Sequence, residues 1–502
     1  MIVHRTNLAW ETLLDLDAST GPRVVRLEHA LRDAVGSGRL PAGAALPASR
    51  RLAESLGVSR WVVTEAYGQL VAEGVLEARV GAGTRVAAGS VQTRQVQTRQ
   101  VQERGATTAR PRRSPAAGPQ GSAATGVPPS GTVPHLPPRP RFDLRPGVPD
   151  LRHVPREAWL RAAREALAGA SSTDLSTAPG LGHPATRSTV AAYLRRARMV
   201  EAPDTAVVVT RGATDAMARV AAALRTAGHT HLLVEDPSWP VLRDVARQAG
   251  LRPVPVPVDA GGVDVERLAE AGARTGARAV LLTPAHQFPT GVALAGERRE
   301  AVLAWVRQVD GLVVEDDYDA EFRYDRRPVA ALQRLDPERV VLLGSVSKTM
   351  SPAFGIGWAV LPAAWRAALG DVARAGAPSV VDQLTVTRFL EGGGYDRHLR
   401  AARTRYRRRH DALAGAVGHR LPDARLHGMA AGLHALLELP GGDEAPDAAE
   451  VVRAAAARDV GVVDLRRYQV RPAARSRTLV LGYGNLVDAR LEEAVARLAS
   501  CV

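Results

Sequence analysis

The sequence predicts two folded units, a small α+β unit at the N-terminus and a larger α/β domain with a mostly parallel sheet. Three observations predict this fold class. Two short helical stretches flank a glycine turn near the N-terminus, a stretch without apolar periodicity follows, and the remaining sequence alternates β-branched runs with helical stretches. At 502 residues, the chain also exceeds the roughly 100–200 residues of one ordinary domain.

The N-terminal unit, residues 1–87, is predicted to contain three helices and a hairpin. Residues 22–37 place apolar side chains at helical spacing, and residues 48–56 form a second, shorter helix. A glycine turn leads into a third helix over residues 60–73, which completes a helix-turn-helix unit. Residues 75–87 alternate apolar and polar side chains around a glycine-rich tip, a pattern typical of a two-stranded wing.

Residues 88–140 are predicted to be a flexible linker. They begin with the tandem repeat VQTRQ-VQTRQ-VQERG and continue in Pro, Gly, Ala, Ser and Thr with scattered arginines. Few large apolar side chains are available there to offset the entropy of ordering the chain. A linker of this length spans on the order of 40 Å.

Residues 141–502 are predicted to form the α/β domain. Short apolar runs alternate with helical stretches, which indicates a parallel sheet covered by helices on both faces. The predicted strands lie at 205–210, 231–236, 277–283, 311–316 and 339–345. From about residue 365 the pattern changes, and it predicts a smaller C-terminal α+β subdomain.

Composition excludes several classes of protein. Hydrophobic residues make up 45% and charged residues 24% of the chain, and no apolar run approaches the ~20 residues that cross a bilayer. The N-terminal residues do not resemble a signal peptide, so we expect a cytoplasmic protein. The single cysteine, Cys501, excludes a disulfide framework, and the scattered histidines predict no catalytic metal. The net charge of +14 suits a polyanionic partner.

The chain contains one lysine, Lys348, while its other 65 basic residues are arginine. A lysine amine can lose its proton and attack a carbonyl to form a Schiff base, which the guanidinium of arginine cannot do. We therefore expect position 348 to need an amine.

Three groups of candidate ligand residues directly follow predicted strands. Because ligands bind outside the carboxyl ends of strands in open α/β sheets, we expect these groups to meet. Gly212, Ala213 and Thr214 begin a helix, where free backbone N–H groups favour a phosphate, although such a turn is also common as simple helix capping.

The second group lies in GLVVEDDYDAEFRY, residues 311–324. A carboxylate opposite a pyridine nitrogen keeps that nitrogen protonated and makes the ring an electron sink. We assign Asp316 to this role and Tyr318 to the ring hydroxyl. Asp317 or Asp319 could hold the nitrogen instead, and an acidic cluster after a strand is also a Mg²⁺ ligand pattern.

The third group lies in GSVSKTMSP, which places the only lysine in a small, hydroxyl-rich turn. Here Ser345 can reach a phosphate and Lys348 an aldehyde. Together the three groups predict a site for a phosphorylated pyridine aldehyde.

Residues 46–86, LPASRRLAESLGVSRWVVTEAYGQLVAEGVLEARVGAGTRV, resemble the winged helix-turn-helix of GntR-type regulators. The resemblance implies that the third helix enters the major groove of double-stranded DNA while the wing contacts phosphates or the minor groove. The residues expected at the DNA are Arg50, Arg51, Ser59, Arg60, Arg79, Gly81, Gly83, Thr84 and Arg85. Trp61-Val62 replaces the usual Asn-Thr, so base reading differs from the family pattern.

The whole chain resembles the MocR/GabR family, in which a GntR-type head is fused to a fold-type I aminotransferase domain. The motifs EDPSWP, TPAHQFPTG, VVEDDYDAEFRY and SVSKTMSP carry this resemblance. It implies pyridoxal 5'-phosphate on Lys348, Trp239 stacked on the cofactor ring, and His286 and Gln287 beside its O3'. It also implies a head-to-tail, domain-swapped homodimer that senses a vitamer or amino compound and controls amine or vitamin B6 genes.

The sequence departs from this family at positions that bind anions. Gly355 replaces an arginine that grips the cofactor phosphate, a bond worth roughly 1.5–3 kcal/mol, or ten- to a hundredfold in affinity. Val241 and residues 479–482 lack the arginines that hold a substrate carboxylate, although Arg477 lies near enough to compensate. This weak carboxylate site argues against efficient transamination and favours pyridoxal phosphate itself as effector, as in PdxR-like members.

Two other functions stay open on the sequence. The first is a catalytically active aminotransferase. The second is a DNA-binding regulator whose second domain has no cofactor and serves for dimerisation. A plain aminotransferase needs no DNA-binding head, and a plain repressor needs no Schiff-base lysine. The regulator with a sensing domain accounts for both halves of the chain.

Overall fold

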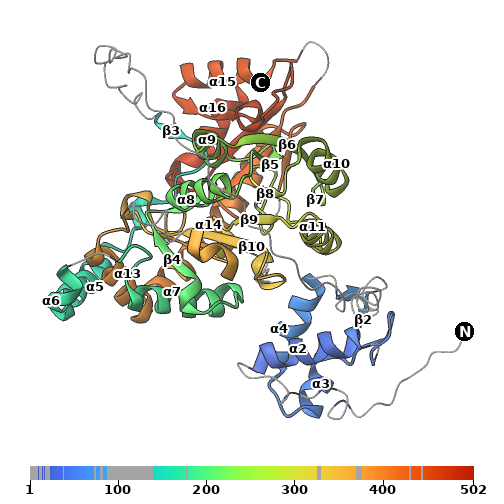
Figure 1. Cartoon of the computed structure of the whole chain (residues 1–502). Helices are drawn as coiled ribbons and strands as arrows, with labels where there is room; N and C mark the ends of the chain where they lie inside the picture. Colours follow the sequence, from blue (N-terminus) through green and yellow to red (C-terminus); the bar gives the residue numbers. More distant parts are fainter. Residues whose placement is uncertain are drawn as a thin grey trace, which may run out of the picture.

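The computed structural model has a small N-terminal head and a larger two-part domain (Figure 1). It describes residues 10, 14, 16, 23–37, 39–72, 75–79, 83–87, 140–176, 179–324, 330–368, 376–428, 431–441 and 445–502. The predicted linker, residues 88–140, lies outside the described residues except for Pro140. No helix within these described ranges is long and apolar enough to cross a membrane.

The head is the predicted winged helix-turn-helix. Its elements are α2 (Arg23–Gly36), α3 (Ser49–Ser55), α4 (Arg60–Ala72), β1 (Leu76–Arg79) and β2 (Gly83–Val86). The two strands pair antiparallel, with Leu76 opposite Val86, and form the wing. Leu27 and Leu31 of α2 pack with Leu52 of α3 and Val63 of α4 in one buried core. These apolar residues recur at helical spacing, which explains why the helices form and face one another.

The large domain is built on an eight-stranded sheet in the order β4-β11-β10-β9-β8-β5-β6-β7. Its strands are β4 (Val207–Thr210), β5 (His231–Asp236), β6 (Arg252–Asp259), β7 (Gly262–Val263), β8 (Ala279–Leu282), β9 (Leu312–Asp316), β10 (Val340–Ser345) and β11 (Gly357–Val360). The strands from β10 to β6 pair in parallel, and β11 runs antiparallel to both of its neighbours. The mostly parallel sheet is confirmed, and all five predicted strands are present.

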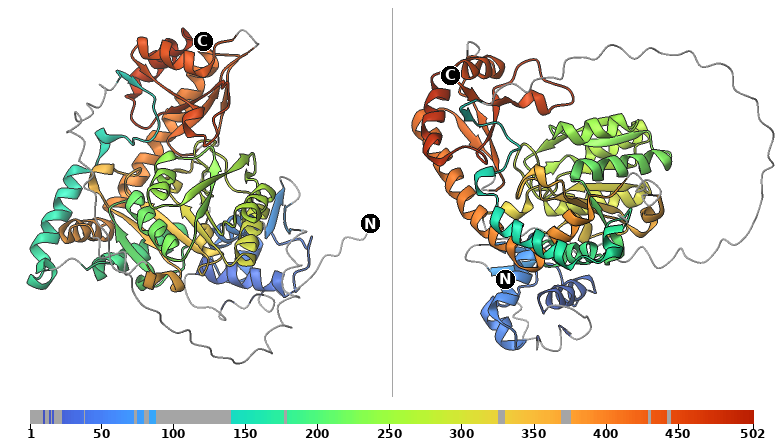
Figure 2. Two further views of the ribbon diagram at one scale, coloured as in Figure 1. Left: turned by 45° about the horizontal axis from the view of Figure 1, so that its top comes forward. Right: turned by 90° about the vertical axis from the view of Figure 1, so that its left-hand side faces the viewer.

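Helices cover both faces of this sheet (Figures 1 and 2). The covering helices are α8 (Ala213–Thr226) and α9 (Pro240–Gln248) on one face, and α10 (Val265–Thr275) and α11 (Gly296–Gln308) on the other. Alternate residues of β5 enter different cores, because successive side chains of a strand point to opposite faces. Leu232 and Val234 pack with α8 and α9, whereas Leu233 packs with α10 and α11.

Further helices surround one end of the sheet and lead into the C-terminal subdomain. They are α5 (Arg156–Gly169), α6 (Ser172–Ser176), α7 (Pro184–Arg198), α13 (Val380–Glu391) and the long α14 (Gly394–Arg420). Figure 2 shows α14 running from the sheet domain to the C-terminal subdomain. Arg409 of α14 is buried and pairs with Asp150 at 2.5 Å and with Asp488, so this part of its arginine-rich run is interior rather than solvated.

The C-terminal subdomain is α+β, as predicted. It contains β12 (Arg425–His427), β13 (His434–Glu438), β14 (Val460–Gly461), β15 (Val463–Asp464), β16 (Thr478–Gly482), α15 (Ala448–Ala457) and α16 (Leu491–Ala499). Four strands form a sheet in the order β12-β13-β16-β15. The first strand of the large domain, β3 (Phe142–Asp143), pairs in parallel with β14. The segment that follows the predicted linker is therefore held by the C-terminal subdomain.

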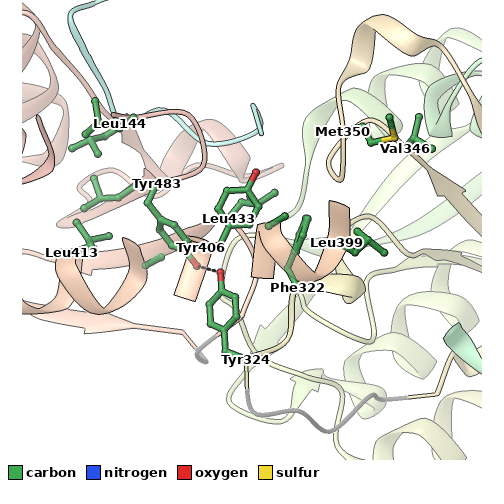
Figure 3. Close-up of a cluster of buried hydrophobic side chains, with 14 of the residues drawn as sticks. Leu144, Phe322, Tyr324, Val346, Met350, Leu399, Tyr406, Leu413, Leu433 and Tyr483 are labelled. Carbon is green, nitrogen blue, oxygen red and sulfur yellow. Dashed lines mark hydrogen bonds between the residues drawn. The ribbon is translucent and has the colours of Figure 1, made fainter. Parts of the chain in front are cut away.

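Buried side chains join the two parts of the large domain (Figure 3). Phe322 and Tyr324, which follow β9, pack against Tyr406 of α14 and Tyr483, which follows β16. The hydroxyl groups of Tyr324 and Tyr483 lie 3.2 Å apart. One continuous core therefore fixes the C-terminal subdomain against the carboxyl ends of the central strands.

The head contacts the large domain through a buried ion pair. Oε2 of Glu28, on α2, lies 2.5 Å from Nη2 of Arg334 in the short helix η4 (Leu332–Arg334). The Glu28 side chain is 0% exposed and that of Arg334 4% exposed. Because both side chains are buried, the pair is a direct contact between α2 and η4.

Candidate functional site

A cavity of about 360 Å³ opens at the carboxyl ends of the central strands. Eight of the ten residues predicted to bind the cofactor line it, namely Gly212, Ala213, Thr214, Trp239, Asp316, Tyr318, Ser345 and Lys348. Asp316 ends β9 and Ser345 ends β10, while Gly212 follows β4. Parallel strands bring these distant residues together because their carboxyl ends meet at one edge of the sheet.

Lys348 lies deep in this cavity. Its Nζ donates a hydrogen bond to the carbonyl oxygen of Gly147 at 2.6 Å and lies 5.0 Å from the ring centroid of Trp239. Burial lowers the pKa of Lys348 from its usual 10.5, an effect that Asp316 and Asp319 oppose by attracting the charge. A lowered pKa leaves a larger fraction of the amine neutral and able to attack a carbonyl.

Asp316 is the carboxylate that faces the cavity. Its Oδ1 is buried and has no hydrogen-bond partner among the described residues. Burial, together with the nearby charge of Asp317, raises the pKa of Asp316 to about 7, although Lys348 opposes this shift. The two alternative carboxylates are engaged elsewhere, because Asp317 pairs with Arg198 at 2.6 Å and Asp319 with His286 at 2.9 Å.

The turn before α8 offers backbone donors at the opposite end of the cavity. Gly212 is the N-cap residue of α8, has φ +121° and makes no side-chain cap, so the first N–H groups of the helix lack the usual partner. The side chains of Ser345 and Ser347 line the cavity beside this turn. Backbone donors, hydroxyl groups and the helix dipole together favour a phosphate.

Glycines let β11 approach this turn closely. A Cβ on Gly357 would lie 2.6 Å from the Cα of Gly212 and 2.7 Å from the carbonyl oxygen of Gly344, distances too short for real contacts. Gly355 differs, since it has φ +57° and a Cβ there would meet nothing within 4 Å. Open space therefore lies where the family pattern has an arginine.

Trp239 forms one wall of the cavity. It is the N-cap residue of α9, and its ring lies edge-on to Phe288 at 5.1 Å and stacked with Tyr468 at 6.0 Å between centroids. A Cβ on Gly147 would lie 3.0 Å from Cη2 of the indole, so this glycine gives the ring its room. The indole is thus held by packing beside Lys348, where a flat ligand ring would stack.

His286 and Gln287 lie behind the cavity wall. Nδ1 of His286 is 3.1 Å from the hydroxyl of Tyr318 and 2.9 Å from Oδ2 of Asp319. Nε2 of Gln287 donates to the carbonyl oxygens of Pro237 and Phe288, which fixes the loop. The structure thus places His286 where it orients Tyr318, places Gln287 in loop packing, and brings neither to the cavity surface.

The cavity also contains residues that the sequence did not predict as cofactor ligands. They are Gly147, Arg211, Phe288, Ser347 and His434, together with Val241, Leu242, Pro352 and Leu433. Phe288 and Ser347 lie within the quoted motifs TPAHQFPTG and GSVSKTMSP, and Arg211 directly precedes Gly212, so their positions were a usable signal. Gly147 and His434 come from distant segments that only the tertiary fold brings to the site.

His434 is the buried imidazole of this set. Burial, with the neighbouring His286 as a second cause, holds its pKa well below the usual 6.5. His286, Asp319 and His434 offer ligand atoms within 4.8 Å of one another. Nδ1 of His286 already contacts both carboxylate oxygens of Asp319, which engages that side chain within the cluster.

A second cavity of about 680 Å³ adjoins the first and shares Trp239 and Val241 with it. Arg145 and Arg467 line it, but Nε of Arg145 is paired with Asp143 at 2.7 Å. Arg477, expected to compensate for the missing carboxylate-binding arginines, does not line either cavity. Its Nη2 instead donates to the carbonyl oxygen of Leu439.

The predicted DNA contacts of the helices are exposed on the head. Arg50 and Arg51 lie on α3, Ser59 and Arg60 at the start of α4, and all four are exposed. The hydroxyl of Ser59 accepts a long hydrogen bond of 3.4 Å from the backbone N–H of Val62, which caps α4. These side chains are therefore available to a duplex.

The wing residues are described in part. Gly83, with φ +81°, and Arg85 are exposed on β2, and Thr84 is half-buried. Arg79 lies on β1, where only the backbone is described, and Gly81 lies outside the described residues. Trp61, which departs from the family pattern, is 64% exposed beside Arg60. An exposed indole at the start of α4 would meet whatever the helix docks against.

Two family models match the chain on either side of the predicted linker. Aminotransferase class I and II matches residues 142–498, and the gntR family of bacterial regulatory proteins matches residues 24–86. An archaeal alanine:glyoxylate aminotransferase covers 72% of this chain and 90% of its own, with 23% sequence identity and a TM-score of 0.65. A Pyrococcus horikoshii kynurenine aminotransferase gives a TM-score of 0.65 at 22% identity over the same share. The fold is thus that of an aminotransferase, joined to a DNA-binding head.

Curated regulators share both parts. The pyridoxine biosynthesis regulator PdxR of Corynebacterium glutamicum is 30% identical over 485 residues, which cover 95% of each chain. The probable rhizopine catabolism regulator MocR of Rhizobium meliloti is 32% identical over 423 residues, covering 82% of this chain and 80% of that one. These matches define a DNA-binding transcriptional regulator with an aminotransferase-like domain. The chain belongs to the MocR family of such regulators.

Pyridoxal 5'-phosphate is the cofactor of this fold, and the cavity fits it. The lysine amine suits its aldehyde, the unpartnered buried Oδ1 of Asp316 suits its pyridine nitrogen, and the uncapped turn at Gly212 suits its phosphate. Trp239 supplies an aromatic face for the ring. Each functional group of the cofactor thus has a complementary group on this chain.

Proposed function

We propose that this chain is a transcriptional regulator whose large domain senses pyridoxal 5'-phosphate, or an amino compound bound through it, and changes DNA binding by the head. The observation that carries the proposal is a buried, unique amine on Lys348, facing Asp316 in a chain that also has a GntR-type head. The proposed domains are a DNA-binding head over residues 1–87, a linker over 88–140 and an effector domain over 141–502.

The side chains of the cavity have distinct roles in this proposal. The amine of Lys348 would hold the aldehyde carbon of the cofactor as a Schiff base, with release of water. Asp316 would hold the protonated ring nitrogen, and the turn at Gly212 would hold the phosphate. Tyr318, oriented by His286, would hold the ring hydroxyl. The bound cofactor supplies an electron-withdrawing ring next to any amine that reaches it.

Of these two effectors, the cavity favours pyridoxal 5'-phosphate itself over an amino acid. Position 241 is a valine, and Arg477 binds the carbonyl oxygen of Leu439, so these positions offer no free guanidinium to a substrate carboxylate. Buried carboxylates need such a partner. The name of the similar PdxR, a regulator of pyridoxine biosynthesis, supports vitamin B6 genes as the target.

An active aminotransferase is the second candidate, because Lys348 and Asp316 stand in one cavity of an aminotransferase fold. The weak carboxylate site favours slow or absent turnover. A third candidate, a domain without cofactor that serves dimerisation, leaves the unpartnered Asp316 unexplained.

The proposed assembly is a head-to-tail, domain-swapped homodimer that acts on operator DNA in the cytoplasm. The similarity to regulators over nearly the whole chain supports it. In this arrangement the linker, spanning on the order of 40 Å, lets the head of one subunit reach the effector domain of the other, and the Glu28–Arg334 contact seen within one chain would form between subunits.

The decisive experiment compares wild-type protein with Lys348→Ala and Lys348→Arg in gel shifts on the chain's own upstream DNA. Pyridoxal 5'-phosphate should change the shift by wild-type protein alone, because arginine keeps the charge of lysine but cannot bond the aldehyde. Borohydride reduction followed by peptide mapping should label position 348. Rapid exchange of amino groups between an amino acid and a keto acid would favour the enzyme, and an unlabelled lysine would exclude the sensor.

A further inference from the structure

Arg211 is the only arginine among the residues that line the Lys348 cavity in the described structure. It lies between the end of β4 and Gly212, the N-cap residue of α8. Its backbone N–H donates to Oδ2 of Asp215 at 2.9 Å, which fixes the backbone of this turn. The side chain itself is exposed. Its guanidinium is thus positioned at the entrance to the turn that offers the free N–H groups of α8.

The nearest acidic side chain on α8 does not neutralise this guanidinium. Both oxygens of Asp215 lie 3.2 Å from Nε of Arg219, which is buried and also donates to the carbonyl oxygen of Gly376. Within the described part of the chain, the guanidinium of Arg211 has no hydrogen bond or ion pair. One of its nitrogens, Nη2, lies 3.6 Å from the position of a Cβ on Gly376. It therefore remains a charged donor available to a ligand.

The strand register places Arg211 beside the space left by Gly355. Thr210 of β4 pairs with Gly357 of β11, so continuing this antiparallel register puts Arg211 opposite Ile356, the neighbour of Gly355. Gly355 carries no side chain, and nothing lies within 4 Å of its Cβ position. Arg211 thus lines the cavity just after β4, next to the segment in which position 355 supplies no charge.

We propose that Arg211 binds the phosphate of pyridoxal 5'-phosphate and replaces, from β4, the charge that position 355 does not provide. The α8 dipole and the hydroxyl groups of Ser345 and Ser347 offer donors but no full positive charge. A phosphate dianion in a partly buried cavity is stabilised by a guanidinium, which can donate two parallel hydrogen bonds to its oxygens. The inference concerns the cofactor site and holds whichever compound acts as effector.

The test measures dissociation constants for two ligands that differ only in the phosphate, pyridoxal 5'-phosphate and pyridoxal. Wild-type protein is compared with Arg211→Gln, with Arg211→Lys, and with Arg161→Gln as the control for loss of one exposed arginine away from the cavity. Absorbance titration of the lysine-bound chromophore gives each constant. Arg211→Gln should weaken pyridoxal 5'-phosphate binding by about ten- to a hundredfold and leave pyridoxal binding unchanged. Arg211→Lys should recover part of the loss.

Selectivity between the two ligands separates phosphate binding from a structural role. Equal weakening of both ligands by Arg211→Gln, or no weakening of either, would overturn the proposal. If Arg211→Gln does not fold, wild-type and Arg211→Lys proteins are compared instead, with inorganic phosphate as a competitor of pyridoxal 5'-phosphate. Inorganic phosphate should compete more weakly in the lysine variant. Equal competition would then overturn it. Lys348→Ala abolishes the chromophore for both ligands, so failure of the sensor and failure of Arg211 give different results.

Discussion

At the scale of single residues, burial disfavours the charged forms of Asp316 and Lys348. Burial raises the pKa of Asp316 to about 7 and lowers that of Lys348. Both shifts reflect the removal of water from a charged group before a ligand has replaced it. The cavity is thus suited to a ligand that brings a proton donor for Asp316 and a carbonyl group for the amine of Lys348.

The raised pKa of Asp316 predicts how the substitution Asp316→Asn changes the stability of the ligand-free protein with pH. The pKa of Asp316 in the folded state lies above its ordinary value of 3.8, so the cost of its ionisation is absent below about pH 4 and fully present above about pH 7. Removing the charge should therefore stabilise the protein at pH 8, by at most about 4 kcal/mol, and change it little at pH 4.

Thermal unfolding of the two proteins at several pH values measures this difference. Asp447, a half-buried carboxylate that caps α15, serves as the comparison, because its pKa is lowered by backbone hydrogen bonds rather than raised. Asp447→Asn should destabilise the protein at pH 8. A pH-independent effect of Asp316→Asn would contradict the burial of its charge.

At the scale of elements, the contact between β11 and the turn before α8 determines the phosphate end of the cavity. We predict that Gly357→Ala destabilises the fold by about 1–3 kcal/mol, because its methyl group would collide with Gly212 and the carbonyl oxygen of Gly344. The same collision should displace the turn and weaken binding of pyridoxal 5'-phosphate.

Gly415→Ala is the matched control, since this glycine lies within helix α14 and a Cβ there meets nothing within 4 Å. It should stabilise the protein by about 0.4–1 kcal/mol. Denaturant unfolding of both variants checks the pair of predictions. If Gly357→Ala were as stable as Gly415→Ala, the close approach of β11 to the turn would be wrong.

Elements were predictable where local pattern and burial agree. The buried strands β4, β5, β8, β9 and β10 are continuous apolar runs, and their carboxyl ends carried most of the candidate site. Strand β6 was missed because Pro253, Pro255 and Pro257 alternate along it, and proline usually marks a break. These prolines share one edge of the strand, which tolerates missing N–H groups because only the two-residue β7 pairs beyond β6.

Other features depend on contacts between distant residues and leave no local signal. Strand β3 forms only because it pairs with β14, more than 300 residues later. The cavity acquires Gly147 and His434 in the same way. For His286 and Gln287 the motif correctly located the loop beside the cavity, but it did not predict the direction in which each side chain points.

At the scale of the whole molecule, the ion pair between Glu28 and Arg334 links the head to the cofactor site. Arg334 follows Leu332 and Gln333, whose backbone N–H groups both donate to the carboxylate of Glu315 at 2.9 Å. Glu315 precedes Asp316 in β9. A continuous set of hydrogen bonds therefore runs from the strand that carries Asp316 to helix α2 of the head.

We predict that Glu28 and Arg334 are energetically coupled. A double-mutant cycle with Glu28→Gln, Arg334→Gln and both together should give a coupling of about 0.5–3 kcal/mol in denaturant unfolding. Each single variant removes one half of the buried ion pair, and the double variant should recover part of the loss. Strictly additive effects would show that the head does not depend on this contact.

In the protein without ligand, the hydrogen bond from Lys348 holds the backbone at Gly147 against the cavity. Gly147 lies on the segment that runs from Pro140 through β3, which is the stretch of chain that arrives from the head. Condensation with an aldehyde would replace two N–H bonds of this amine by a double bond to carbon, so a ligand that fills the cavity would compete with the hydrogen bond to Gly147. In the proposed sensor, this competition would act on the segment that leads from Pro140 into the large domain.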